Sequence, residues 1–332
     1  MGNLPPELLP IVLRAAIVIG FVMSLVPLLT WAERKVVADM QVRIGPNRAG
    51  PFGLLQPLAD GLKLLFKEEI IPTQADKWVY LLAPAVAMVP ALISVAIIPF
   101  GKGELWRVAD VNVGILYILA VTSLSVYGIV LAGWSSNSKW SLLGGLRSSA
   151  QMISYELTMG LAVASVVIAA GTLRLPQFVE LQAGGVLHWL VIPQFVSFLA
   201  LFIAGLAETN RAPFDLPEAE SELVAGYHTE YTGFKFLMFT LGEYSAIFTV
   251  SAVLSTLFLG GWQPPFPVAP FTWLPGPVWL LLKCSVIIFI FMWLRATLPR
   301  FRYDQLMAFG WKFMLPVTLI NLAVTAAWVA LR

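Results

Sequence analysis

Long apolar segments alternate with short charged ones along the whole chain. A membrane-spanning helix needs about 20 mostly apolar residues, and eight segments approach that length, although the fifth carries Pro193 and Gln194. They lie near residues 8–31, 78–99, 113–133, 148–171, 190–207, 236–259, 278–298 and 311–331. Because no soluble domain remains between them, the pattern predicts an all-α, polytopic membrane protein, with one integral membrane domain over residues 1–332.

A shorter helical pattern follows the first long loop. Near residues 53–69, leucines recur at helical spacing on one face, while Asp60, Lys63 and Lys67 lie off that face. This is typical of an amphipathic helix that lies in the plane of the lipid headgroups. A helix that packs against a neighbouring subunit shows the same pattern, so both interpretations stay open.

Composition agrees with a membrane location. The chain is 58% hydrophobic and 12% charged, whereas soluble domains carry roughly 25% charged residues. The net charge of +2 gives no basis for binding nucleic acid. A single cysteine, Cys284, excludes disulfides within the chain and clusters held by several cysteines.

The basic residues are distributed unequally between the two sides of the predicted bundle. Most of the 21 Lys and Arg residues lie in or beside the loops after the first, third, fifth and seventh spans. Short loops rich in Lys and Arg stay in the cytoplasm. We therefore expect these long loops to be cytoplasmic and both termini to lie outside, on the periplasmic side.

The loop between the fifth and sixth spans is the most acidic part of the chain. Asp215-Leu-Pro-Glu218 predicts a helix that starts with Asp215 as its N-cap. Continued helix would stack Asp215, Glu218 and Glu222 on one face, where like charges raise one another's pKa and titrate as a coupled set. The alternative is a solvated loop that caps a helix. The acids of this segment are Glu208, Asp215, Glu218, Glu220, Glu222 and Glu230.

Two further carboxylates lie within predicted spans. Glu156 and Glu243 are each roughly 12–14 Å from the cytoplasmic end of their helix, at 1.5 Å per residue. A charged side chain at such depth costs about 2.5–3.5 kcal/mol or more. Protonation removes this cost, so both are candidate proton carriers. A protonated glutamate that only joins two helices is the alternative.

Nucleotide and haem motifs are missing from the sequence. It contains no Gly-x-Gly-x-x-Gly or Walker-type loop. The two histidines, His188 and His228, fall on opposite sides of the predicted membrane and cannot form a bis-histidine haem site. Any redox centre must therefore belong to a partner.

Four long motifs resemble those of a known family, the H subunit of bacterial respiratory complex I (NADH:quinone oxidoreductase), which is the counterpart of mitochondrial NADH dehydrogenase subunit 1. The resemblance covers essentially the whole chain. The motifs are Glu33-Arg-Lys followed by Gln41-Val-Arg-Ile-Gly-Pro-Asn-Arg and Gly53-Leu-Leu-Gln-Pro-Leu-Ala-Asp60; Ser148-Ser-Ala-Gln-Met-Ile-Ser-Tyr-Glu156; Glu208-Thr-Asn-Arg-Ala-Pro-Phe-Asp-Leu-Pro-Glu-Ala-Glu-Ser-Glu222; and Arg295-Ala-Thr-Leu-Pro-Arg-Phe-Arg-Tyr-Asp-Gln305.

The resemblance implies a subunit of the bacterial inner (plasma) membrane that joins the peripheral and membrane arms of an NADH-oxidising, proton-pumping enzyme. Its substrate would be quinone (ubiquinone or menaquinone), which enters a cavity from the lipid, while FMN and iron–sulfur clusters would lie on partner subunits only. The implied quinone-cavity residues are Glu33, Arg34, Arg43, Arg48, Asp60, Tyr227, Glu230 and Tyr231. The implied proton path consists of Glu156, Glu208, Asp215, Glu218, Glu220, Glu222 and Glu243.

Three other functions compete with this one. The first is that of the anchoring subunit of a related membrane-bound hydrogenase, which resembles the H subunit. A stand-alone proton-coupled transporter could use Glu156 and Glu243, although transporters tend to show repeated halves and broken helices. A purely structural anchor gains nothing from the cost of buried carboxylates.

Overall fold

The computed structural model describes residues 8–103, 106–215 and 224–331. Within these ranges every regular element is helical and no strand is present, so the predicted all-α class is confirmed. Seven helices are long and apolar enough to cross a membrane. They are α1 (Leu8–Met40), α3 (Lys77–Val95), α4 (Gly114–Ser135), α5 (Lys139–Ala170), α9 (Gly233–Phe258), α10 (Gly276–Thr297) and the continuous segment Tyr303–Ala330.

The last of these helices contains a change of pitch. It begins as α11 (Tyr303–Ala308), widens into a π-helix, η6 (Phe309–Met314), and continues as α12 (Leu315–Ala330). An eighth apolar helix, α7 (Phe195–Glu208), is shorter. It begins at Phe195 and not at residue 190 because Pro193 lies just ahead of it and lacks the N–H that a continuing helix needs.

Three helices extend well beyond the predicted apolar spans. Helix α1 continues to Met40, not residue 31, and α5 begins at Lys139, not residue 148. The last helix begins at Tyr303, not residue 311. Hydropathy marks only the part of a helix that lies in hydrocarbon, whereas backbone hydrogen bonding continues past it. The additional turns of α1 carry Glu33 and Arg34, so the charges of the first motif lie on a rigid helix.

The shorter elements connect the long helices. The predicted amphipathic helix is present as α2 (Gln56–Phe66), with Leu58, Leu62 and Leu65 exposed. Sequence reasoning missed α6 (Leu175–Leu181). Four 3-10 turns complete the described elements: η1 (Pro51–Gly53), η3 (Val186–His188), η4 (Gly226–His228) and η5 (Phe271–Trp273). The helix predicted to start at Asp215 would cover residues 216–223, so Glu218, Glu220 and Glu222 lie outside the described residues.

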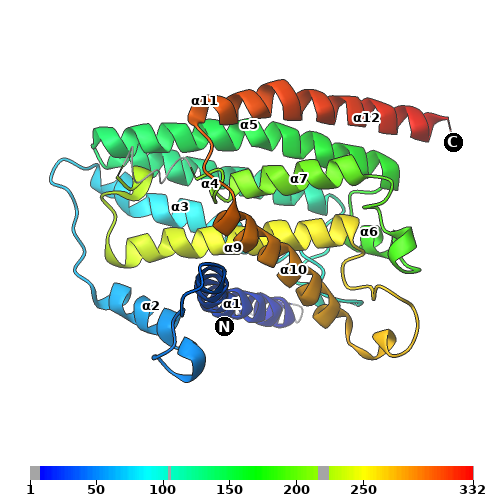
Figure 1. The fold of residues 1–332 in the computed structure, drawn as a ribbon, viewed down its shortest axis with the longest axis horizontal. Coiled ribbons are helices and arrows are strands. Elements are labelled where there is room, and N and C mark those ends of the chain that lie inside the picture. Colours follow the sequence, from blue (N-terminus) through cyan, green and yellow to red (C-terminus); the bar gives the residue numbers. More distant parts are fainter. Residues whose placement is uncertain (1–7, 104–105, 216–223, 332) are drawn as a thin grey trace.

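Helix α9 is the centre of the bundle (Figure 1), and it contacts α1, α2, α3, α6, α7 and α10. Most of its residues are buried, including the large side chains Phe248, Leu254 and Phe258. By contrast, α1 and the Tyr303–Ala330 helix bury little of their apolar length. A chain with its apolar side chains on the outside fits a lipid environment.

Glycines allow the closest helix contacts. A Cβ added at Gly128 of α4 would lie 2.5 Å from the backbone nitrogen of Ala87 in α3. One added at Gly144 of α5 would lie 2.7 Å from the backbone of Gly226. Small residues let backbones approach in this way within membranes. The contact at Gly144 places η4, and with it Tyr227, directly against α5.

Polar side chains close the far end of α9. The ammonium of Lys283, in α10, donates to the carbonyl oxygens of Leu259, Gly261 and Gln263 at 2.6, 2.8 and 2.7 Å. The amide of Gln182 donates to further carbonyls, those of Thr256 and Leu257. The last carbonyls of a helix have no partner within it, so these two side chains satisfy groups that lipid could not.

Candidate functional site

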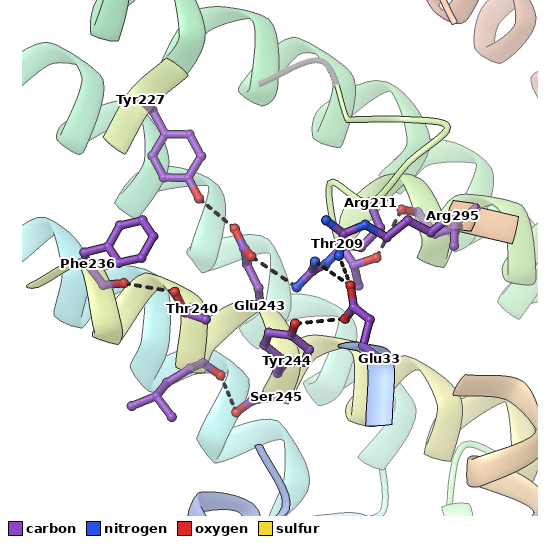
Figure 2. A network of polar contacts seen from close by, with 12 residues as sticks. Glu33, Thr209, Arg211, Tyr227, Phe236, Thr240, Glu243, Tyr244, Ser245 and Arg295 are labelled. Carbon is purple, nitrogen blue, oxygen red and sulfur yellow. Dashed lines mark hydrogen bonds and ion pairs between the residues drawn. The ribbon is translucent and has the colours of Figure 1, made fainter. Parts of the chain in front are cut away.

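A buried network of charges lies where α1, α9, α10 and the segment after α7 meet (Figure 2). Its centre is Glu33, whose side chain is 9% exposed. One carboxylate oxygen lies 3.4 Å from the guanidinium of Arg211 and is also ion-paired with Arg295. The other accepts a hydrogen bond from the Tyr244 hydroxyl at 2.8 Å. Two cations and a hydroxyl thus hold this carboxylate.

Arg211 joins this carboxylate to a second one. Its guanidinium lies 3.6 Å from an oxygen of Glu243 and 4.5 Å from the centre of the Tyr244 ring. The other oxygen of Glu243 accepts a hydrogen bond from Tyr227 at 3.0 Å. Figure 2 shows the resulting order, from Arg295 through Glu33 and Arg211 to Glu243 and Tyr227. Buried charges persist when they are paired and hydrogen-bonded in this way.

A cavity of about 750 Å³ opens beside this network, a volume typical of small-molecule sites. Residues of α1, α9, α10 and the loop at 41–46 form its wall. Of the predicted cavity residues, Glu33, Arg34 and Arg43 line it, together with Glu243, which was predicted for the proton path. Arg48, Asp60, Tyr227, Glu230 and Tyr231 are absent from its lining.

Asp60 instead fixes α2 to α1 near the cavity. One carboxylate oxygen lies 2.5 Å from Arg34, and the other accepts a hydrogen bond from Gln56 at 3.1 Å. Partial burial alone would raise the pKa of Asp60, but these hydrogen bonds and the positive charges of Arg34 and Lys63 outweigh it, so the pKa lies below its usual value. The indole of Trp31 also donates to the carbonyl of Phe52 at 3.1 Å.

Smaller cavities continue from the large one into the bundle. A cavity of about 50 Å³ shares Glu243 with the large cavity and is also lined by Tyr227 and Glu208. A third, of about 20 Å³, shares Glu208 and Thr122 with the second. Both smaller cavities exceed the roughly 10–15 Å³ that one water molecule needs. Carboxylates therefore stand at both junctions between the cavities.

Glu156 extends this series of acids. Its carboxylate interacts electrostatically with that of Glu208, which is 7% exposed at the end of α7. The hydroxyls of Thr122 and Ser123 lie near the carboxylates of Glu208 and Glu156 respectively, and both donate to the carbonyl of Leu119. One oxygen of Glu156 is buried and has no hydrogen-bond partner within the described part of the chain. Within the described residues, neither Glu156 nor Glu208 forms an ion pair with a Lys or Arg side chain.

The remaining predicted residues lie elsewhere. Asp215 pairs with Arg300 at 3.0 Å. Tyr231 stacks on Tyr80 with ring centres 4.2 Å apart, and the Tyr80 hydroxyl donates to the carbonyl of Glu230 at 2.7 Å. Burial raises the pKa of the Tyr231 phenol to about 12. These contacts hold the segment after η4 against α3, away from the large cavity.

Sequence reasoning did not assign site roles to Arg211, Tyr244 and Arg295. Arg211 is one of the few cations in the acidic segment, and Arg295 is the first residue of the fourth motif. Their positions in the sequence could therefore have identified both as candidate site residues. In residues 8–103, 106–215 and 224–331 no group of three or more His, Cys, Asp and Glu side chains is placed to hold a metal ion. The arrangement can bind a polar group in the large cavity and pass protons between buried acids.

Comparison with known proteins gives one consistent result. The family model for NADH dehydrogenase matches residues 13–326. The H subunit of NADH-quinone oxidoreductase from Rhodospirillum rubrum is 53% identical over 98% of this chain and 96% of that protein. An H subunit of NADH-quinone oxidoreductase from Geobacter sulfurreducens is 53% identical over 97% of this chain and 95% of that protein. The chain therefore belongs to the NADH dehydrogenase family, which confirms the resemblance to the H subunit that its motifs predicted.

Proposed function

We propose that this chain is the membrane subunit of a proton-translocating NADH:quinone oxidoreductase that receives quinone and passes the effect of its reduction to buried acids. The observation that carries the proposal is the series of three adjoining cavities, with Glu243 and Glu208 at their junctions. The relatives' names supply the reaction. NADH and FMN belong to partner subunits of the peripheral arm, because this sequence has no nucleotide-binding motif. The iron–sulfur clusters belong there too, because one cysteine cannot hold a cluster.

The large cavity suits a quinone, which has a polar headgroup and an apolar tail. Arg211, Arg295 and Tyr244 place donors at its inner wall. Near its opening, α2 presents exposed leucines, and they offer an apolar surface where a tail can leave toward lipid. Arg34, Arg43 and Glu33 would line or brace the cavity, as the family resemblance implies. Arg48, Asp60, Tyr227, Glu230 and Tyr231 would then act from outside it.

Electrostatic coupling would link the reaction to the acids. Reduction of quinone to quinol takes two electrons from the partner's cluster and two protons, and the headgroup carries negative charge until the protons arrive. Charges act strongly across a low-dielectric interior. A negative headgroup would draw Arg211 away from Glu243 and let a proton enter there. Glu208 and Glu156 then pass protons onward, and Asp215, Glu218, Glu220 and Glu222 would serve as further acids of the path.

Glutamine variants test this path. In the complete enzyme in sealed vesicles, Glu156→Gln and Glu208→Gln should each lower NADH-driven proton uptake at least severalfold, because glutamine cannot carry a proton. Glu180→Gln, at an exposed acid on α6, is the matched control and should leave uptake unchanged. Normal uptake in both path variants would refute the proposed proton path.

Co-purification tests the wider assignment. Mild extraction from the native membrane should bring flavin, iron–sulfur and antiporter-like subunits with this chain. A nickel–iron hydrogenase in their place would identify a hydrogenase anchor, and a lone chain would indicate a transporter.

The same proposal fixes the orientation. The end of the bundle with α2 and the cavity faces the cytoplasm, and both termini face the periplasm. Cys284, the native cysteine, is buried, so cysteines introduced at Lys139 and Lys102 can be labelled without background. An impermeant maleimide added outside intact cells should label Lys102→Cys and spare Lys139→Cys. The reverse pattern would invert the orientation.

A further inference from the structure

Three helix ends meet at the bundle end that carries α2. The backbone N–H of Asp76, just before α3, donates to the carbonyl of Ser135 at the end of α4, at 3.1 Å. The amide of Asn137 donates to the Gln74 side chain at 3.2 Å. Lys139, the first residue of α5, follows directly. These ends of α3, α4 and α5 lie on the same side of the bundle in Figure 1.

Three tryptophans are exposed at this place. Trp78 is 77% exposed, Trp134 56% and Trp140 42%. None of their indole N–H groups has a hydrogen-bond acceptor within the described part of the chain. Tryptophan gathers at the level of the lipid headgroups because its ring is apolar and its N–H needs a polar partner. Each indole here can donate to a phosphate or ester oxygen outside the protein.

Two lysines stand among the tryptophans. Lys77 and Lys139 are exposed, and neither forms an ion pair with a carboxylate of the described residues. The ammonium of Lys139 lies 5.3 Å from the centre of the Trp140 ring. The nearest acid in sequence, Asp76, accepts from the backbone of Val79 as the N-cap of α3. The cluster therefore carries an excess of positive charge.

We propose that Trp78, Trp134, Trp140, Lys77 and Lys139 form a binding site for the headgroup of an anionic phospholipid, here named the tryptophan–lysine site. The lysines meet the phosphate, the indoles donate to phosphate and ester oxygens, and the acyl chains lie along the apolar faces below. Exposed leucines follow the site residues at helical spacing: Leu81 and Leu82 on α3 and Leu142, Leu143 and Leu146 on α5.

A free phosphate ion would use the lysines alone. The exposed aromatic and leucine surface instead favours an amphiphile, since it stays in contact with acyl chains. A membrane-proximal lysine attracts anionic lipid with a strength that corresponds to about a fivefold change in binding. The site should therefore prefer phosphatidylglycerol to phosphatidylcholine, and it does not depend on the proposed quinone chemistry.

Photolabelling tests the site in the protein as purified from its native membrane with its partners. The sample is placed in nanodiscs of equal phosphatidylglycerol and phosphatidylcholine, with one lipid at a time carrying a photoreactive acyl chain, and labelled peptides are identified by mass spectrometry. Peptides that contain the three tryptophans should be labelled at least severalfold more by phosphatidylglycerol. The double variant Lys77→Gln/Lys139→Gln should lose this preference.

Lys102→Gln/Lys312→Gln is the matched control, because it also removes two exposed lysines but from other places, and it should keep the preference. Equal labelling by both lipids would overturn the proposal, as would a preference that survives in the double variant. Missing labels in the assembled complex would overturn it too, by showing that a neighbouring subunit covers the surface. Displacement of the label by inorganic phosphate would assign the lysines to a soluble anion.

Discussion

The two groups of buried acids in this protein differ in what surrounds them. Glu33 contacts Arg211, Arg295 and the Tyr244 hydroxyl. Glu156 faces another carboxylate, that of Glu208, and keeps one oxygen without a hydrogen-bond partner in the described residues. An acid enclosed by cations stays ionised and holds helices together. Glu156 and Glu208, which no cation faces within the described residues, can change protonation at little structural cost and are suited to passing protons onward. Glu243 can accept a proton only when its ion pair with Arg211 is weakened.

The largest expected effect comes from removing Arg211, the cation between Glu33 and Glu243. Arg211→Met leaves Glu33 with one guanidinium fewer and takes from Glu243 its ion pair with Arg211. Loss of one partner of a buried pair costs about 3–5 kcal/mol. The variant should assemble poorly, as measured by the amount of intact complex on native gels. Arg211→Lys keeps the charge and should recover part of the loss. Full assembly of Arg211→Met would show that the network has no structural role.

Glu156→Gln should behave in the opposite way. Because no cation depends on Glu156, its replacement should change the thermal stability by less than about 1 kcal/mol, while proton uptake falls severalfold. The measurement is a thermal melt of the purified complex beside a pumping assay on the same preparation. If stability and pumping fell together, the two groups of acids would not differ as proposed.

Tyr227→Phe has a smaller expected effect. It removes the hydrogen bond to Glu243 and leaves the ring contacts with His228 and Phe239 in place. One buried hydrogen bond contributes about 1–1.5 kcal/mol. We expect a modest drop in melting temperature and slower proton uptake at unchanged quinone affinity. Tyr231→Phe, whose hydroxyl bonds the Tyr80 carbonyl instead, should cost similar stability and leave proton uptake unchanged.

The smallest effect is expected at the exposed ion pair. Arg34 and Asp60 are 50% and 33% exposed, and pairs of this kind contribute at most about 1 kcal/mol. Asp60→Asn should therefore hardly alter stability, and salt should reduce the difference further. Because the folded pKa of Asp60 is lowered, its contribution is present above pH 3.8 and is lost as the pH falls through the folded value. A melt series at falling pH measures this, and a large effect at neutral pH would contradict it.

Much of the fold could be predicted from sequence because lipid imposes a length and a composition on each crossing helix. The ends of the helices were predicted less accurately. Glu33 was expected in a loop after residue 31, yet α1 carries it as a helical residue to the network. Hydropathy is blind to such extensions, since a helix continues in water as long as its backbone bonds and packing favour it.

Contacts between residues far apart in the sequence could not be predicted, for a different reason. Arg295 meets Glu33 because α1 and α10 contact each other and both pack on α9. A single sequence does not state which helices are neighbours. The motifs did mark Arg34 and Arg43 near the cavity, but the same motif also contains Arg48, which does not line it. Motif membership thus selects a region, and only the packing selects the residues that face inward.

The end of α9 opposite the cavity has a consequence for the medium in which the protein works. Carbonyl oxygens grouped like those of Leu259, Gly261 and Gln263 would otherwise be ligands for a sodium or potassium ion. Here the ammonium of Lys283 takes that position and is tied to α10 by its own side chain. A hydrogen-bond donor that is covalently attached cannot be washed out or exchanged. This end of the bundle should therefore keep its shape whatever the monovalent salt composition outside.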